Sequence, residues 1–345
     1  MAAELHYPLA SEPGTGDGSA VEVAPGVMWL RMPLFASLPW INIWAVAEAD
    51  GWSIVDTGLR SAKTIDAWQA AFGQALGGAP VVRVLATHMH PDHCGMAGWL
   101  AERFNVRLWM TRLEYLTCRL LAADTGRSAP AEGVNFYRAA GWPVEAIERY
   151  QAKFGFFGES IYPMPASYRR IADGETLRLG RHDWQVVVGS GHSPEHASLY
   201  CPELKLLISG DQVLPRISSN VSVHPTEPDA DPLRDWLESL RKIRERVPDD
   251  VLVLPAHNSP FRGLHARIGD LIDSHTGGLA RLERLLGEPK RVIDVFRALF
   301  ARPITAGLLG MATGEALAHL NYLRFTGRAV RETDGDGVWH WRRVE

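Results

Sequence analysis

Apolar runs that alternate with amphipathic stretches dominate the first two thirds of the chain. Runs at 27–32, 42–48, 81–86 and 106–110 favour strands, and a helical spacing of apolar residues favours helices at 62–77 and 94–104. The β pattern restarts at 173–177 and continues at 184–188, 206–210 and 251–256. The last three runs are apolar, rich in β-branched residues or leucine, and closed by Gly or Pro, which predicts strands that end abruptly.

The ends of the chain have a different character. Residues 1–20 are rich in Gly, Ser and acidic residues and predict a loose arm. After about residue 262, helical patterns follow one another at 264–275, 279–286, 291–300 and 314–325. Short segments at 329–332 and 338–342 flank the turn signal Asp334-Gly335-Asp336-Gly337, which predicts a terminal hairpin.

Composition narrows the class of protein. The 345 residues are 46% hydrophobic and 22% charged, as in a globular protein with one large domain or a domain with an appendage. No apolar run approaches the roughly 18–20 residues that a membrane span needs, and no secretory signal is visible at the start. Cys94, Cys118 and Cys201 form no spaced framework, so we expect a cytoplasmic protein.

One turn carries an unusual density of metal-binding side chains. His88, His90, Asp92 and His93 fall within six consecutive positions directly after the predicted strand at 81–86. Imidazole nitrogen and carboxylate oxygen are the common ligands of zinc-like cations. The turn therefore predicts a metal site, against the alternative of a solvated polar loop.

Three more potential ligands follow predicted strands. His192 comes after 184–188, Asp211 after 206–210 and His257 after 251–256. Each residue alone would more often be an ordinary core or loop residue. Four strand ends that carry His or Asp in one chain favour a site with two metals.

The order His88, His90, Asp92, His93, His192, Asp211, His257 resembles the metallo-β-lactamase superfamily, as does the segment Trp52 to Gly58, which ends in Asp-Thr-Gly. The resemblance covers about residues 20–260. It implies an α/β (α+β) fold, an αββα sandwich, within a hydrolase domain at 21–261. It also implies the following roles: His88, His90 and His192 hold one divalent ion, Asp92, His93 and His257 hold the second, Asp211 bridges them, and Asp56 orients a ligand histidine.

One position departs from the antibiotic-cleaving branch. Those relatives often carry a cysteine near the second metal, whereas this chain has Asp211. Oxygen in place of sulfur makes the site harder, so Mn²⁺ or iron can serve beside Zn²⁺, the metal that we expect. The ligand set looks like the hydrolases grouped around glyoxalase II, lactonases and phosphodiesterases, and β-lactam cleavage is disfavoured.

The region after residue 262 resembles the winged-helix appendage of one branch of the superfamily, which includes acyl hydrolases and an RNA endonuclease. We therefore expect a winged-helix-like domain at 262–345. Residues 258–345 carry 13 Lys and Arg against 10 Asp and Glu, which is a weak charge for nucleic-acid binding. We interpret this domain as a packing or homodimerisation module that can also close the cleft.

Two segments are candidates for substrate contact. The apolar loop at 33–40 contains Phe35 and Trp40. It is either an apolar lid beside the metals or a loop that covers the core or a subunit interface. A helical insertion at about 111–170, with patterns at 113–123 and 144–154 and many aromatic residues, either walls the cleft or thickens the core. Arg216, in the loop after Asp211, is a candidate to meet a substrate carboxylate or phosphate.

Three functions follow from these patterns. The first is a hydrolase of a small-molecule acyl thioester, ester or lactone, in which a metal-bridging hydroxide attacks the carbonyl and Asp92 handles its proton. The alternatives are a phosphodiesterase or ribonuclease and a non-catalytic metal-binding scaffold. The apolar loop and the aromatic insertion favour the first.

Overall fold

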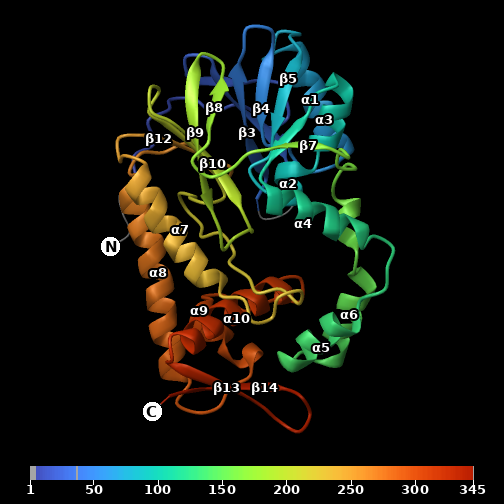
Figure 1. Ribbon diagram of the computed structural model, residues 1–345, viewed down its shortest axis with the longest axis vertical. Helices are drawn as coiled ribbons and strands as arrows, with labels where there is room; N and C mark the ends of the chain where they lie inside the picture. Colours follow the sequence, from blue (N-terminus) through green and yellow to red (C-terminus); the bar gives the residue numbers. More distant parts are fainter. Residues whose placement is uncertain (1–4, 36–37, 345) are drawn as a thin grey trace.

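The computed structural model describes residues 5–35 and 38–344, and two β-sheets pack face to face in the upper half of the view (Figure 1). The first sheet has seven strands in the order β1 to β7: Val21–Ala24, Val27–Pro33, Trp40–Ala47, Trp52–Val55, Val81–Leu85, Leu108–Met110 and Tyr168–Arg170. The second has five strands in the order β12-β11-β10-β9-β8: Leu252–Pro255, Leu206–Gly210, His196–Cys201, His182–Gly189 and Thr176–Leu179.

The two sheets are held together by side chains that alternate along their strands. Trp29 on β2 and Trp44 on β3 stack with ring centroids 6.0 Å apart, and they share a core with Trp184, Ile208 and Leu254 of the second sheet. Successive strand residues point to opposite faces, so every second residue enters this layer. The other residues face the helices outside.

Helices cover both outer faces, which confirms the αββα sandwich. α1 (Ala62–Gly73) and α3 (Ala97–Phe104) pack on the first sheet, where Trp68 and Leu100 are buried. α7 (Pro232–Arg246) packs on the second sheet through Trp236, and α8 (Leu264–Leu285) lies beside it. Ser61 begins α1 because its hydroxyl accepts the backbone N–H of Thr64.

The strand directions place several loops at one edge of the sandwich. β4, β5, β6 and β7 pair in parallel, and β11 pairs in parallel with β12. Parallel strands end at the same edge of their sheet, so the turns after β4, β5, β11 and β12 can meet. The short helix α2 (Pro91–Cys94) forms part of the turn after β5.

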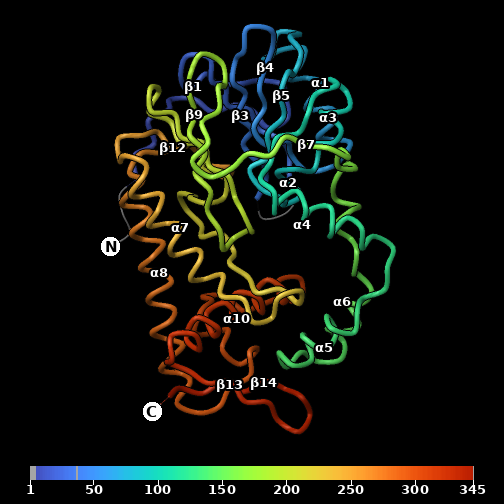
Figure 2. The backbone as a smooth tube through the Cα atoms, viewed as in Figure 1, coloured from blue at the N-terminus to red at the C-terminus, as the bar shows by residue number. Residues whose placement is uncertain are grey.

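The predicted helical insertion leaves the sandwich after β6 and returns to it at β7 (Figure 2). It contains α4 (Arg112–Ala123), α5 (Ala131–Ala139), α6 (Val144–Lys153) and the short 3-10 helix η1 (Phe156–Glu159). The helices predicted at 113–123 and 144–154 are α4 and α6. α5 and the edge strand β7 were not predicted.

The C-terminal part is helical and ends in a hairpin. After α8 come η2 (Val292–Val295), α9 (Phe296–Leu299), α10 (Leu309–Phe325), β13 (Ala329–Thr333) and β14 (Trp339–Arg343). The prediction of two helices at 264–275 and 279–286 was wrong, because α8 continues through Gly277-Gly278. Gly278 is buried, and a Cβ there would lie 3.5–3.6 Å from Leu299 and His319, so close packing offsets the weak helix propensity of glycine.

The N-terminal segment also differs from the predicted loose arm. From residue 5 onward it contacts the sandwich: His6 pairs with Arg262, and Glu12 forms an ion pair of 2.7 Å with the buried Arg31. A buried guanidinium requires a partner, and Glu12 supplies it. Within the described part of the chain, none of the helices combines the length and apolar character needed to cross a membrane.

Candidate metal centre

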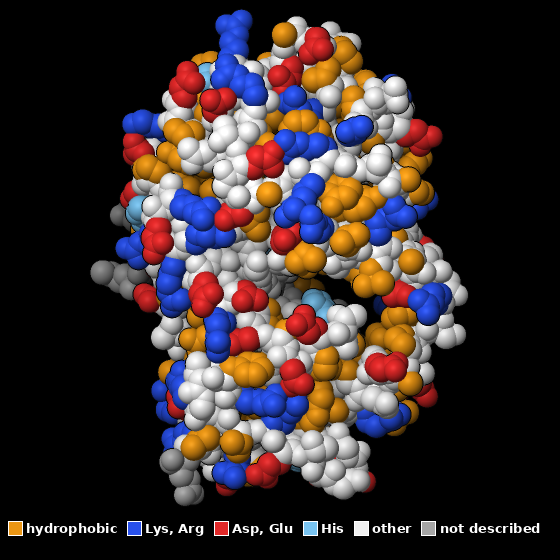
Figure 3. Space-filling view, viewed as in Figure 1, with side chains coloured by type: hydrophobic (Ala, Val, Ile, Leu, Met, Phe, Trp, Pro, Cys, Tyr) orange, Lys and Arg blue, Asp and Glu red, His pale blue; other side chains and the backbone are white. Residues whose placement is uncertain are grey.

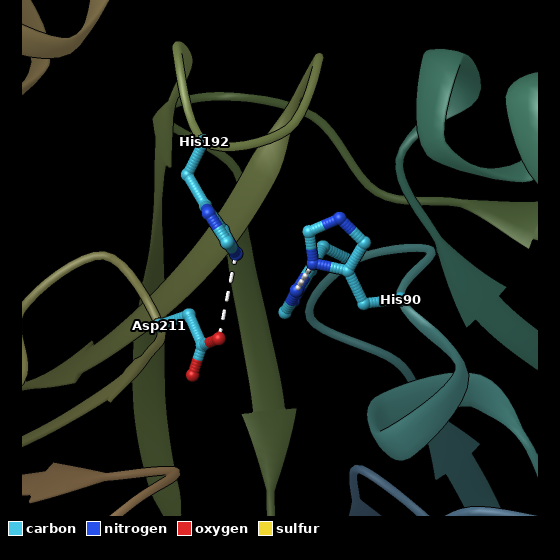
Figure 4. Close-up of side chains that lie close together, drawn as sticks. His90, His192 and Asp211 are labelled. Carbon is cyan, nitrogen blue, oxygen red and sulfur yellow. Dashed lines mark hydrogen bonds and ion pairs between the residues drawn. The ribbon is translucent and has the colours of Figure 1, made fainter. Parts of the chain in front are cut away.

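Seven side chains that the sequence singled out converge at the edge where these strands end. They form two groups, each with potential ligand atoms within 4.8 Å of one another. One group is His88, His90, His192 and Asp211, and the other is Asp92, His93 and His257. Figure 4 shows His90, His192 and Asp211 directed toward one another from separate loops.

In the first group the ring nitrogens point inward. Nε2 of His88 lies 2.8 Å from Nδ1 of His90. The carbonyl of Asn220 accepts a hydrogen bond of 2.7 Å from Nδ1 of His192, so Nε2 of His192 carries the lone pair, 3.4 Å from Oδ2 of Asp211. Burial, followed by the proximity of His192, lowers the pKa of His90 to about 3, so this imidazole stays neutral.

In the second group Oδ2 of Asp92 lies 3.3 Å from Nε2 of His257 and 3.6 Å from Nε2 of His93. Burial opposes ionisation of Asp92, but the charge of His93 and a hydrogen bond from His257 lower its pKa to about 2. Nδ1 of His257 lies 3.3 Å from the carbonyl of Trp40. The group therefore presents one carboxylate and two imidazoles.

Asp211, a member of the first group, also reaches the second. Its Oδ2 faces His192 of the first group, and its Oδ1 lies 3.5 Å from Nε2 of both His93 and His257 in the second. Burial raises its pKa, but the positive charges of His93 and His257 outweigh this and lower the pKa well below the usual range. The ionised carboxylate can thus reach both groups at once.

The residues present fit divalent metal ions. Among the described residues, buried Nε2 of His93, Nε2 of His192 and Oδ1 of Asp211 have no hydrogen-bond partner, although such atoms are normally satisfied. All three point into the cluster. Imidazole nitrogen with carboxylate oxygen is a donor set that Zn²⁺, Mn²⁺ and Fe²⁺ accept.

Asp56 fixes the orientation of one histidine. Its Oδ2 accepts a hydrogen bond of 2.8 Å from Nδ1 of His93, and its Oδ1 accepts 2.8 Å and 2.9 Å bonds from the backbone N–H and hydroxyl of Thr87. Burial opposes the charged form of His93, but the carboxylates of Asp56, Asp92 and Asp211 raise its pKa well above the usual range. The bond from Nδ1 to Asp56 keeps Nε2 turned toward the cluster, where a metal ion would take the place of the Nε2 proton.

Two residues that the sequence did not single out support the cluster. Buried Glu114 on α4 accepts hydrogen bonds from the backbone N–H of Met89 (2.9 Å), the hydroxyl of Ser193 (2.6 Å) and the backbone N–H of Glu195 (2.8 Å). It therefore ties the turn after β5 to the loop that carries His192. Nε2 of buried His196, at the start of β10, accepts a 3.0 Å bond from the backbone N–H of Asp211.

Of the predicted substrate contacts, Trp40 is the one that adjoins this centre. The Phe35 ring is 53% exposed, and the adjoining loop residues 36–37 lie outside the described residues. Trp40 stacks under the Arg31 guanidinium at 4.3 Å and meets the cluster through its carbonyl, beside His257. Arg216 is exposed over Tyr7, 5.6 Å from the ring centre, so its role toward substrate remains a prediction.

Comparison with known proteins agrees with this geometry. Residues 41–257 match the model of the metallo-beta-lactamase superfamily, and residues 279–344 match that of the metallo-beta-lactamase-like C-terminal domain. A beta-lactamase domain protein from Burkholderia ambifaria is 40% identical in sequence, with a TM-score of 0.90 over 99% of this chain and 98% of its own. A metallo-beta-lactamase family protein from Thermus thermophilus is 26% identical, with a TM-score of 0.78 over 94% of this chain and 100% of its own.

A curated relative carries a named activity. The acyl-coenzyme A thioesterase MBLAC2 of Gallus gallus is 25% identical over 68% of this chain and 79% of its own length. The superfamily match spans more than half of the chain, and the superfamily consists generally of hydrolases. From its fold, its His and Asp clusters that could bind metal ions, and these matches, this chain belongs to the metallo-beta-lactamase superfamily.

Proposed function

We propose that this protein is a dinuclear metal-dependent hydrolase of acyl thioesters. The observation that carries the proposal is the position of Asp211, whose two carboxylate oxygens face two separate groups of inward-pointing ligand atoms. His88, His90 and His192 would hold one ion, Asp92, His93 and His257 the other, and Asp211 would contact both. Two such ions supply Lewis acidity and activate water for attack on a carbonyl carbon.

The thioester class is supported by the similarity to the Gallus gallus acyl-coenzyme A thioesterase and by the surface beside the cluster. On the face shown in Figure 3, hydrophobic side chains rim a hollow between the sandwich and the C-terminal helices. Exposed Leu113, Leu116 and Leu120 form one stripe along α4. An acyl chain would bury such a surface at a gain of about 25 cal/mol per Å².

The chain's own residues perform the remaining tasks. Water adds to the thioester carbonyl, the carbon–sulfur bond breaks, and an acid and a thiol leave. Oδ2 of Asp92 lies among the ligand atoms of the second group, so its carboxylate would take the proton of the attacking water and pass it to the leaving sulfur. Asp56 and the Asn220 carbonyl hold His93 and His192 in position.

A nucleic-acid substrate has less support. The arginines in and just before the terminal hairpin are largely paired with carboxylates: Arg331 and Arg324 with Asp229, Arg328 with Glu283, and Arg342 with Glu332. Paired guanidiniums offer little charge to phosphates. The terminal hairpin and the end of α10 therefore fit a packing role better than nucleic-acid binding.

The test is turnover by protein loaded with Zn²⁺, Mn²⁺ or Fe²⁺ on a panel of acyl-coenzyme A, acyl-glutathione, simple ester, lactone and single-stranded RNA substrates. We expect thioester hydrolysis that is lost in His90→Ala and Asp211→Ala. Background rates on every thioester from fully loaded protein would overturn the proposal. RNA cleavage lost in His90→Ala would assign a ribonuclease instead, and full loading with no turnover on any substrate would favour a scaffold.

A further inference from the structure

A pocket lies away from the metal-ligand cluster, where the helical insertion meets the start of α10. Its volume is about 360 Å³, within the usual range for small-molecule sites. One wall is aromatic and comes from the insertion: Tyr137, Trp142, Tyr150, Phe154, Phe156 and Phe157. The opposite wall is the chain around 306–310, which leads into α10.

The aromatic wall is a connected set of rings. Trp142 stacks on Tyr137 with centroids 4.1 Å apart and planes at 29°, and Tyr150 meets Tyr137 edge-on at 4.7 Å. Nε1 of Trp142 donates a 2.8 Å hydrogen bond to the hydroxyl of Thr313 and so fixes the wall to α10. Such a wall suits a planar ring, because flat heterocycles stack on aromatic faces.

Two cations line the same pocket. Arg149 and Lys153 are four residues apart on α6, so they project from one face of the helix. Both are exposed, and within residues 5–35 and 38–344 neither has an ion pair or a hydrogen bond. The opposite wall adds the start of α10, where Leu308 provides no side-chain cap. Free cations beside open helix N–H groups favour a phosphorylated ligand.

The pocket and the metal-ligand cluster are linked through α10. Its residues Leu309 and Gly310 line the pocket, while Asn220 donates to the Met311 carbonyl (3.4 Å) and the Glu315 carboxyl (2.8 Å). The carbonyl of Asn220 in turn holds His192. Five residues of helix span about 8 Å, so a ligand with a flexible arm can occupy both places.

We propose that this pocket binds the nucleotide of a coenzyme A thioester. The adenine would stack on the aromatic wall, the phosphates would meet Arg149, Lys153 and the start of α10, and the pantetheine arm would carry the thioester through the hollow to the cluster. This inference rests on the proposed thioesterase function. An acyl chain in the pocket would leave Arg149 and Lys153 without a charged partner. The nucleotide would stack its adenine on the aromatic wall and offer its phosphates to these two cations.

Kinetics with two matched substrates tests the assignment. Hydrolysis of an acyl-coenzyme A is compared with that of the same acyl group on pantetheine, which lacks the nucleotide, in wild type, Arg149→Ala, Lys153→Ala and the double variant. Arg241→Ala is the control, since Arg241 is an exposed arginine on α7 outside both sites. We expect the double variant to raise KM for acyl-coenzyme A about tenfold or more and to leave kcat unchanged. The kinetic constants for the pantetheine substrate should stay the same.

Equal effects of the variants on both substrates, or an effect that follows acyl length instead of the nucleotide, would overturn the inference. A second measurement needs no turnover: calorimetry with adenosine 3′-phosphate 5′-diphosphate, which must bind wild type and Arg241→Ala and weaken about tenfold in the double variant. Binding with that dependence but no thioester hydrolysis would refute the proposed function alone. Hydrolysis that ignores the nucleotide, with no nucleotide binding, would refute the pocket assignment alone.

Discussion

The carboxylate of Asp56 lies 2.8 Å from Nδ1 of His93. The backbone of Asp56 itself is in the left-handed region, with φ of +62°. A non-glycine residue in this conformation carries a backbone cost, which the hydrogen bonds to His93 and Thr87 offset. The strained turn after β4 therefore serves to direct one histidine of the cluster.

Replacement of Asp56 by Asn removes the charge that orients His93. Because partners of ligand histidines typically contribute tenfold to hundredfold in metal affinity, we expect Asp56→Asn to weaken binding of one ion by about that factor. Competition with a chelator, followed by metal analysis, measures this. Asp66→Asn, at an exposed position on α1, is the control. Equal affinities in Asp56→Asn and wild type would show that the hydrogen bond does not act on the metal.

Glu114 accepts three hydrogen bonds in a buried position, so an amide cannot replace it. The Glu114→Gln side chain turns an N–H group toward N–H or O–H donors, and we expect a loss of about 2–3 kcal/mol in the free energy of unfolding. Chemical denaturation of metal-free protein isolates this effect from metal binding. Glu102→Gln, exposed on α3, should change stability by less than about 0.5 kcal/mol. A similar small change in both variants would contradict the structural role of Glu114.

Gly210 precedes Asp211 and has φ of +50°, and a Cβ there would lie 2.4 Å from Nε2 of His196. We expect Gly210→Ala to displace Asp211 and abolish binding of at least one ion. Gly174→Ala provides a matched control, because Gly174 also has positive φ, +76°, but no atom within 4 Å of the added methyl group. Gly174→Ala should lower the free energy of unfolding by about 1–2 kcal/mol and leave the metal content intact. Metal retention in both variants would show that the cluster tolerates the displacement.

Two buried histidines of the C-terminal part should make stability depend on pH. Nδ1 of His275 lies 3.2 Å from Nε2 of His319, and burial lowers the pKa of His275 to about 3 and that of His319 to about 4. The unfolded chain binds their protons near pH 6.5, so stability falls as pH drops from about 6.5 toward 4, by up to about 1.4 kcal/mol per pH unit for each histidine.

Denaturation of metal-free protein at several pH values checks this slope. His319→Gln should flatten it by about 1.4 kcal/mol per pH unit, while His6→Gln, at an exposed position, should leave it unchanged. Parallel slopes in wild type and His319→Gln would mean that His319 takes up its proton in the folded protein.

The sequence predicted most of the sandwich because its strands are short apolar runs with clear ends. The candidate ligands were visible for the same reason, since they lie in the turns that follow such runs. Glu114 gave no local signal: an acidic residue in the first turn of a helix is ordinary, and only the fold brings Met89 and Ser193 to it. The continuity of α8 through Gly278 and the packing of Glu12 on Arg31 also depend on distant contacts that local patterns do not contain.

We propose above all that Asp211 joins two groups of candidate ligands into one hydrolytic centre. Stepwise addition of Zn²⁺ to metal-free protein, with bound metal and acyl-thioester turnover measured on the same samples, tests it most directly. We predict that two ions bind per chain and that turnover rises to its maximum as the second binds, whereas Asp211→Ala loses at least one ion together with turnover. Full activity with a single ion, or two bound ions with background rates on every thioester, would contradict the account.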